Sequence, residues 1–343
     1  MLPREATLTI TINGKTVTSD LLPYLTSLNY TDKSDDELDD FDITLEDREK
    51  LFQNKWALED GATIEAYVTC TNWFTLGDRW ILDFGEFQCD ELEFSASMSG
   101  DTVSIKGLPS AVTTSIKGEK KTRTWNNVKL ETVISDIADE NDLNYRLKID
   151  DTGKNEIHNR IDQRSETDLE FLQRIVKEYG YRVVVKSDYI IVYSGQTADG
   201  TDPIVMIRKL SNITSARFKR KLDAVYSGAT VSNTNTGDGT TSTSTITPKG
   251  DVPKTKKQLK VDTRCETAAQ SERVANAELR EKNAERLTGS LSMMGDPRMR
   301  AGRVLQISGF GAFDGKYSIK EAKHSFSSSG YTTEVELEEA LDY

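Results

Sequence analysis

The sequence is poor in the side chains that most often carry chemistry. Its 343 residues include three cysteines and two histidines. The cysteines, Cys70, Cys89 and Cys265, form no CxxC pair, and their odd number and irregular spacing argue against a disulfide framework and against a zinc site. We expect them to be buried free thiols in a reducing cytosol.

Long apolar runs are also missing. No run approaches the roughly 20 apolar residues that a membrane span needs, and the first residues lack the apolar core of a signal peptide. Hydrophobic residues nevertheless make up 36% of the chain, which is enough for real cores. The length suggests two or three domains. We therefore expect a soluble protein that is made in the cytoplasm and does not contact a membrane.

Positive charge is in short supply. The chain has 44 Lys and Arg against 56 Asp and Glu, which gives a formal net charge of −12. Nucleic-acid binding draws much of its affinity from Lys and Arg on phosphates, so this balance argues against specific nucleic-acid binding as the main role. Like charge would still let DNA slide past such a surface without sticking.

Motifs of catalysis and of metal or cofactor binding are absent from the sequence. No Ser or Cys stands in a nucleophile elbow, and the acidic segment from Asp32 to Asp47 lacks the ligand order of an EF-hand. The run Gly14-Lys15-Thr16 lacks the earlier glycine of a P-loop. We predict that the protein is not an enzyme and has no catalytic, cofactor-binding or metal residue, although a hydrolase that uses only carboxylates stays open.

What the sequence does contain is a pattern of strands and turns that occurs twice. The stretch from Gly295 to Leu337 alternates apolar and polar residues between turns marked by Gly or Asp-Pro, which indicates consecutive antiparallel strands. A shift of about 230 positions places it on a similar stretch near the N-terminus. Two hairpins can look alike by chance, but the number of matches favours two copies of one β-domain. The matched pairs are Gly85 with Gly315, Phe87 with Tyr317, Cys89 with Ile319, Glu91 with Glu321, Ser95 with Ser325, Ser97 with Ser327, Gly100 with Gly330, Thr102 with Thr332 and Ile105 with Val335, and Gly61 stands where Gly302 stands.

The repeat bears on the two histidines, His158 and His324. His324 stands in a repeated strand where the other copy has Phe94, which favours a packing role over a catalytic one. Neither histidine is predicted to act in catalysis.

The N-terminal copy predicts an all-β barrel or sandwich. Residues 5–13 alternate strictly, and Asn13-Gly14 is a strong signal for a two-residue hairpin turn. A short helix is expected from Lys50 to Leu58, and four or five strands from Gly61 to Lys106. Aromatic residues available for the core are Tyr67, Trp73, Phe74, Trp80, Phe84 and Phe87.

Between the copies, residues 116–195 predict a small α/β domain. After a basic link at 117–123, apolar residues from Val128 to Ala138 recur at helical spacing, with Asn126 or Asn127 as the N-cap. A second helix follows Thr167, which forms a predicted capping box with Glu170. This helix stops at Gly180, and a tight hairpin follows it.

The rest of the chain, residues 196–343, holds the second copy. Residues 232–254 are nearly all small and polar, which predicts a mobile surface loop. A long helix is expected at about 266–287, followed by the strands of the repeat. The predicted domains are therefore 1–115, 116–195 and 196–343, and the fold class is mainly β (α+β).

The order of these parts resembles the phage late control gene D protein family. That family includes the baseplate hub of contractile phage tails and the N-terminal region of VgrG spike proteins. The run from Gln163 to Gly180 is similar to the helix motif of the family. Further similar segments are Thr124-Trp125 with the helix ending near Asp142-Leu143, Ser290–Pro297, Ala301-Gly302, Gly309–Gly311, Asp314–Tyr317, His324 and Gly330–Thr333.

The resemblance implies two similar tube-like β-barrel domains with the small α/β domain between them. It also implies a homotrimer that forms a pseudo-sixfold ring and joins a threefold central spike to a sixfold tail tube. The implied partners are the tail tube protein, the central spike protein, other baseplate proteins and the tape measure protein. The chain would be made in the bacterial cytoplasm and assembled into the baseplate of a virion or a phage-tail-like particle such as a tailocin or another contractile injection system.

Two other functions stay open. One is a receptor- or carbohydrate-binding protein at the tail tip, which exposed aromatic clusters would favour. The other is a tail-associated cell-wall hydrolase. The chain stops at Tyr343 without the extended β-helix of VgrG, so a separate spike protein is expected.

Overall fold

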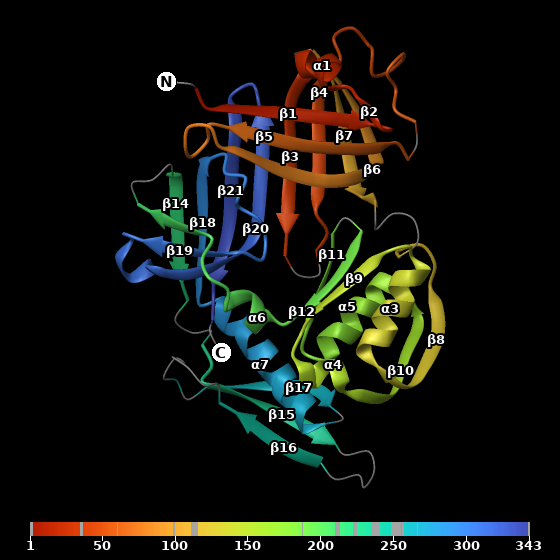
Figure 1. Ribbon diagram of the computed structural model, residues 1–343, viewed down its shortest axis with the longest axis vertical. Coiled ribbons are helices and arrows are strands. Elements are labelled where there is room, and N and C mark those ends of the chain that lie inside the picture. Colours follow the sequence, from red (N-terminus) through yellow and green to blue (C-terminus); the bar gives the residue numbers. More distant parts are fainter. Residues whose placement is uncertain are drawn as a thin grey trace.

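The computed structural model describes residues 3–341, apart from 35–36, 60, 99, 111–115, 187, 210–212, 222–224, 235–240, 248–254, 256 and 266. The fold is mainly β and is built around one large sheet of 13 strands. Figure 1 shows this sheet in the upper part of the molecule, with the small α/β domain and a three-stranded sheet below it.

The first part of the large sheet comes from the N-terminal residues. Asn13 and Gly14, with φ of 48° and 72°, form the predicted turn between β1 and β2. In space the strands run in the order β3-β4-β7-β6-β5-β1-β2. The elements are β1 (Glu5–Ile12), β2 (Lys15–Thr16), α1 (Thr18–Leu21), η1 (Leu22–Tyr24), β3 (Leu25–Lys33), β4 (Asp40–Glu46), β5 (Thr63–Thr71), β6 (Arg79–Ser97) and β7 (Gly100–Pro109).

Two details of this part differ from the sequence predictions. Residues 50–58 form turns and not a helix, because the Asp47 carboxylate accepts hydrogen bonds from the Phe52 backbone and the Gln53 side chain and closes the chain into a turn. Tyr67 and Trp80, predicted for the core, are exposed. Trp73, Phe84 and Phe87 are buried as expected, and Phe74 packs at the edge of the core.

The small α/β domain has its own core beneath two short sheets, β10-β8 and β11-β12-β9. The capping box of Thr167 and Glu170 and the hairpin after Gly180 are confirmed. The elements are β8 (Lys121–Lys129), α3 (Leu130–Glu140), β9 (Asn144–Lys148), α4 (Asp151–Asn155), β10 (Ile157–Glu166), α5 (Asp168–Glu178), β11 (Arg182–Lys186), β12 (Tyr189–Tyr193) and α6 (Gly195–Asp199).

The predicted N-cap at Asn126 or Asn127 is wrong. The last residues of the basic link, 121–123, and the residues after them form β8, which pairs with β10 as far as Lys129, and the helix starts only at Leu130. The tertiary pairing with β10 supplies backbone partners that a local reading of the sequence does not reveal.

The C-terminal part returns to the large sheet. Its elements are β13 (Val205–Arg208), β14 (Ile213–Arg220), β18 (Leu287–Met294), β19 (Val304–Ser308), η2 (Gly311–Phe313), β20 (Gly315–Ser327) and β21 (Gly330–Glu339). Between β14 and β18 lies an insertion of β15 (Gly228–Thr234), β16 (Thr241–Ile246), β17 (Gln258–Cys265) and α7 (Ala268–Ala284). Helix α7, predicted at about 266–287, packs on this three-stranded sheet and faces the small domain (Figure 1).

The expectation of a loop throughout 232–254 does not hold. Residues 232–234 belong to β15 and residues 241–246 form β16, and the two strands pair in an antiparallel hairpin. Residues 235–240 and 248–254 lie outside the described residues. Polar Ser and Thr residues are compatible with a strand when partner strands and a packed face are present. Here β15 pairs with both β16 and β17, and this sheet packs on the core beneath α7.

The strand pairing repeats along the chain, residue by residue. Phe87 lies opposite Pro109 and Ser97 opposite Gly100 in the β6–β7 hairpin, and their counterparts Tyr317 with Glu339 and Ser327 with Gly330 pair in the β20–β21 hairpin. Both hairpins carry a register shift at the equivalent place, Cys89/Glu91 and Ile319/Glu321. The series β3-β4-β7-β6-β5 thus has a second copy in β14-β18-β21-β20-β19.

The outer strands of the two copies also correspond. β3 pairs with β4 with a register shift between Leu25 and Ser27, and β14 pairs with β18 with one between Ile213 and Ser215. Gly61 and Gly302, which precede β5 and β19, have φ of 77° and 76°. A bulge and a left-handed glycine at equivalent places indicate the same local twist in both copies.

The two copies do not form separate sheets. β3 of the first copy pairs antiparallel with the second half of β20 of the second copy, from Ser27 opposite Ser327 to Lys33 opposite Glu321. The 13-stranded sheet is therefore continuous across the two copies.

Candidate functional site

The candidate site is the junction of β3 with β20, because it decides how the two copies are held together. On one side of the sheet the junction is polar: the Ser325 hydroxyl donates to the Asn29 side chain at 2.7 Å, and Lys33 lies opposite Glu321. On the other side it is apolar and closed, with Tyr30 opposite His324. A sheet with one polar and one packed face is the usual form of an antiparallel sheet that borders solvent or a channel.

His324 is the central buried group of the junction, at 1% exposure. Its ring stacks near that of Tyr30, with centroids 6.2 Å apart. Nε2 lies 2.8 Å from the Met299 carbonyl oxygen, so Nε2 carries the proton, and Nδ1 accepts from the Tyr331 hydroxyl at 2.8 Å. Burial lowers the pKa of His324 to about 4 and outweighs the opposing effect of the Met299 carbonyl. The ring is a neutral structural group at pH 7, as its place in the repeat suggested.

A second link between the copies comes from Trp73. Its Nε1 donates to the carbonyl oxygen of Gly295 at 2.7 Å, and its ring lies 6.0 Å from that of Tyr331. A Cβ on Gly295 would stand 2.0 Å from the Tyr331 ring, so glycine is required for this close approach. The turn that follows β18 in the second copy is thus held against the first copy.

Charged groups connect the junction to the small α/β domain. Lys186, at the end of β11, forms ion pairs with Asp32 of β3 and with Asp39, the latter at 3.3 Å. Asp32 also accepts from the Ala301 backbone at 3.1 Å. Burial raises the pKa of Asp39 to about 6, while burial and the nearby Arg300 lower the pKa of Lys186 to about 7. These groups border a cavity of about 430 Å³. The contacts of Lys186 with Asp32 and Asp39 form a strut between the large sheet and the small domain.

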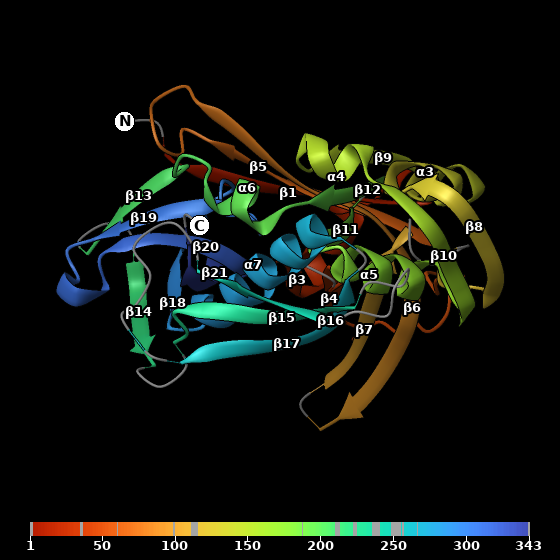
Figure 2. The same cartoon turned by 90° about the horizontal axis from the view of Figure 1, so that it is seen from below.

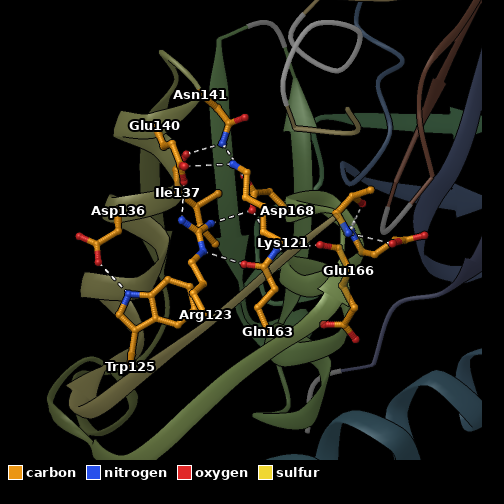
Figure 3. Close-up of polar contacts among 12 residues, drawn as sticks. Lys121, Arg123, Trp125, Asp136, Ile137, Glu140, Asn141, Gln163, Glu166 and Asp168 are labelled. Carbon is orange, nitrogen blue, oxygen red and sulfur yellow. Dashed lines mark hydrogen bonds and ion pairs between the residues drawn. The ribbon is translucent and has the colours of Figure 1, made fainter. Parts of the chain in front are cut away.

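The run from Gln163 to Gly180, which resembles the helix motif of the family, is organised around one buried carboxylate, Asp168. Its side chain is fully buried and accepts hydrogen bonds from Lys121 and Arg123, each at 2.7 Å (Figure 3). Burial alone would raise the pKa of Asp168, but hydrogen bonds from Asn141, Lys121 and Gln163 and the charge of Arg123 hold it below its usual range. The carboxylate therefore ties β8 to the first turn of α5, where a negative charge also suits the helix dipole.

Polar side chains around Asp168 form a network of hydrogen bonds and ion pairs. Gln163 donates to Asp168 at 2.9 Å and accepts from Arg123 at 2.7 Å. Arg123 also pairs with Glu140, and Trp125 donates to Asp136 at 2.8 Å (Figure 3). The Trp125 ring stacks on that of Phe171. The spacing of Gln163, Thr167 and Asp168 in the sequence thus reflects a structural clamp.

The described residues offer little for catalysis. They contain no group of three or more His, Cys, Asp or Glu that could hold a metal ion. His158, like His324, is buried, and its ring packs 4.0 Å from that of Tyr179, with its pKa lowered by burial. Among the helices that the structure describes, none is both long and apolar enough to cross a membrane.

Sequence reasoning found His324 and assigned Trp73 to the core, but it did not show the long-range contacts of the junction. Trp73, Lys186 and Asp32 act through partners more than a hundred positions away, and no local pattern marks such pairs. Only the acidic character of the segment after Asp32 pointed to this region.

Comparisons with known proteins give a consistent result. The family model described as YQBQ-like matches residues 117–338. The probable baseplate hub protein of Escherichia phage 186 is 27% identical over 194 residues, which cover 56% of this chain and 46% of that protein. This chain therefore matches less than half the length of that relative.

Solved structures share the fold over nearly the whole chain. The 43 kDa tail protein of prophage MuSo2 from Shewanella oneidensis superposes with a TM-score of 0.72 at 14% identity, over 98% of this chain and 99% of that one. An E. coli component of the type VI secretion system, described as similar to the T4 tail proteins gp27 and gp5, superposes with a TM-score of 0.58 at 11% identity, over 96% and 76% of the two chains. At these identities the likeness concerns the fold.

The buried histidine predicts a pH dependence of stability. Between about pH 6.5 and pH 4 the unfolded chain takes up a proton at its histidine, whereas His324 in the folded chain does not. Its contribution is complete above about pH 6.5 and falls as the pH is lowered to about 4, by at most about 3 kcal/mol. Urea unfolding at pH 7, 5.5 and 4.5 should show this fall, and His324→Gln should make it shallower. An unchanged slope in His324→Gln would contradict the assignment. His158→Gln should also make the slope shallower, because burial lowers the pKa of His158 as well.

The clamp predicts a large effect of one uncharged substitution. Asp168→Asn keeps the shape of the side chain but removes the charge that Lys121 and Arg123 share, so we expect a loss of roughly 3 kcal/mol in the free energy of unfolding at pH 7. Asp162→Asn is the control, since Asp162 accepts from Arg160, Arg164 and Thr124 on the surface of the same domain. If chemical denaturation gave equal losses in the free energy of unfolding for the two variants, the Asp168 carboxylate would not be the main stabilising charge of the domain.

Proposed function

Because this chain belongs to the YQBQ-like family, whose model covers residues 117–338, we propose that it is the structural hub of a contractile tail baseplate, in a phage or a phage-tail-like particle. The name of the phage 186 relative, a probable baseplate hub protein, supports this role. The fold shared with prophage tail proteins supports it independently.

The observation that carries the proposal is the repeated strand series with its matching registers. Two similar units per chain and three chains would give a ring of six similar units. Such a ring can match a sixfold tail tube on one side and a threefold spike on the other with a single type of subunit. We assign residues 1–115 and 196–343 to the two tube-like domains and residues 116–195 to the domain between them.

The polar face of the large sheet fits the inside of such a ring. Strand register places on one face the side chains of Asp40, Asp42, Glu91, Glu93, Glu321, Glu334, Glu336, Lys33, Lys106, Lys323, Arg217 and Lys219. Carboxylates outnumber the cations in this set, and like charge would keep DNA or another acidic cargo from adhering. A positive calculated potential along the channel of the assembled ring would contradict this part of the proposal.

The partners follow from the role. A homotrimer of this chain would contact the tail tube protein, a separate central spike protein, other baseplate proteins and the tape measure protein. The trimer would act through its shape and its interfaces with these proteins. Obligate interfaces of this kind bury roughly 2,000 Å² or more of accessible surface. A catalytic function has no support in the part of the chain that the structure describes, where both histidines are buried.

The proposal predicts the mass and the shape of the purified protein. We expect native mass measurement to give a trimer of the 38.4 kDa chain, and class-averaged end-on electron micrographs to show six density lobes around a pore. A trimer is expected because three chains with two similar units each give the six units that match a sixfold tube. A compact monomer over the micromolar range, or a ring with another number of lobes, would overturn the proposal.

A further inference from the structure

Two strand edges of the large sheet are open within the chain. β6 pairs with β7 along its second half, but on its other side β5 pairs only with residues up to Gln88. β14 is the last strand at one end of the sheet and pairs only with β18. No other strand of the described residues lies on these edges, and Figure 2 shows the β6–β7 hairpin projecting away from the rest of the sheet.

The repeat identifies what these edges correspond to. Residues 91–97 of β6 are the counterpart of residues 321–327 of β20, and β14 is the counterpart of β3. In the chain, β3 and β20 pair and form the junction. Their counterparts β14 and β6 do not pair within one chain, where β18, β21, β20, β3, β4 and β7 lie between them in the sheet.

We propose that β14 of one subunit pairs with the second half of β6 in the next subunit, in the same antiparallel manner as β3 with β20. The occupant of each open edge is thus a second copy of this chain. This inference rests on the proposed trimeric hub, and it specifies which strands join the subunits and in which register. The contact is heterologous, so a ring of three subunits leaves no such edge open.

The register follows from the junction within the chain. The pairs His324–Tyr30 and Phe326–Leu28 become Phe94–Phe218 and Ala96–Ala216 between subunits. The pair Lys323–Thr31 on the polar face becomes Glu93–Lys219. Each main-chain pairing satisfies backbone groups that an open edge leaves to solvent.

The apolar side of β6 carries side chains of the kind that a neighbouring strand covers elsewhere in the sheet. Leu92 and Phe94 lie opposite Ile105 and Val103, in the rows of side chains that form the core, yet they are 46% and 44% exposed. Their counterparts Ala322 and His324, which β3 covers, are 0% and 1% exposed. The difference between the two copies lies in the neighbouring strand, which is present for β20 and open for β6.

β14 contributes to an aromatic cluster that corresponds to the one at the junction. In the first copy the ring of Tyr30 stacks on Phe84 at 4.7 Å and lies 6.1 Å from Phe87. In the second copy Phe218 stacks on Phe313 at 5.7 Å and lies 5.7 Å from Tyr317, the counterpart of Phe87. Phe94 of the next subunit would extend this cluster as His324 extends the first one.

The charges of the two edges are opposite in sign. The exposed face of β6 carries Glu91 and Glu93, whereas β14 carries the exposed residues Arg217 and Lys219. The junction within the chain has the same polarity, with Lys33 on β3 opposite Glu321 on β20. Cross-strand pairs of opposite charge favour this register over one that is shifted by a residue, which would place the charges on the other face.

A cysteine pair tests the register directly. Ala96→Cys combined with Ala216→Cys should form disulfides between subunits under mild oxidation, because facing positions in adjacent antiparallel strands bring their Cβ atoms to about 5 Å. Non-reducing electrophoresis should then show a covalent trimer. Each single variant controls for the native thiols, and Ser95→Cys with Ala216→Cys controls for register, since those two side chains point to opposite faces of the sheet. A ring that is trimeric by native mass but gives no covalent trimer, or that links equally through the off-register pair, would overturn the proposed joint and leave the hub function standing.

A charge exchange provides a second, reversible test. Glu93→Lys or Lys219→Glu alone should raise the concentration at which the trimer dissociates by about tenfold or more, since each ring contains three such joints. The double exchange should restore most of the loss, and Glu86→Lys, on the first half of β6, should leave the trimer unchanged. Absence of rescue by the double exchange would count against the register. A native chain that is monomeric at every concentration and yields no cross-link would instead overturn the hub function itself.

Discussion

The structure depends on the antiparallel pairing of β3 with the second half of β20. This pairing joins residues almost 300 positions apart, as the hydrogen bond between Ser325 and Asn29 illustrates. It turns two copies of a strand series into one continuous sheet and buries His324 beside Tyr30. Because main-chain hydrogen bonds in a sheet fix position as well as orientation, the two copies have a fixed register, and the turn at Gly295 and the strut of Lys186 only reinforce it.

The remaining parts support this sheet through charge and packing at its margins. Lys186 ties the small domain to Asp32 in the junction, and Asp168 holds β8 on α5 within the small domain. Helix α7 reaches the same domain through Arg273, which pairs with Glu156. The contacts of Lys186 and Arg273 connect elements whose own cores are separate, so in these two cases charged groups join parts that share no apolar core.

The sequence correctly indicated a family resemblance, and the match of the YQBQ-like model together with the phage 186 relative confirms it. It also located the capping box at Thr167, the turn at Asn13-Gly14 and the internal repeat, because each of these is written in residues that are close together or similarly spaced. It failed at Asn126, at the polar residues that form β16 and at the exposed Trp80. In each case a partner strand, or the lack of one, decides the outcome.

What the sequence by itself determined is the local content of the chain: its hairpins, its helix caps, and the fact that one strand series occurs twice. Only the tertiary structure decided how the edges of those strands are used. β3 covers β20 and buries His324, while the matching edge of β6 leaves Phe94 exposed. The physical reason is that backbone donors and acceptors are the same in every residue except proline, so the sequence of an edge strand does not name its partner.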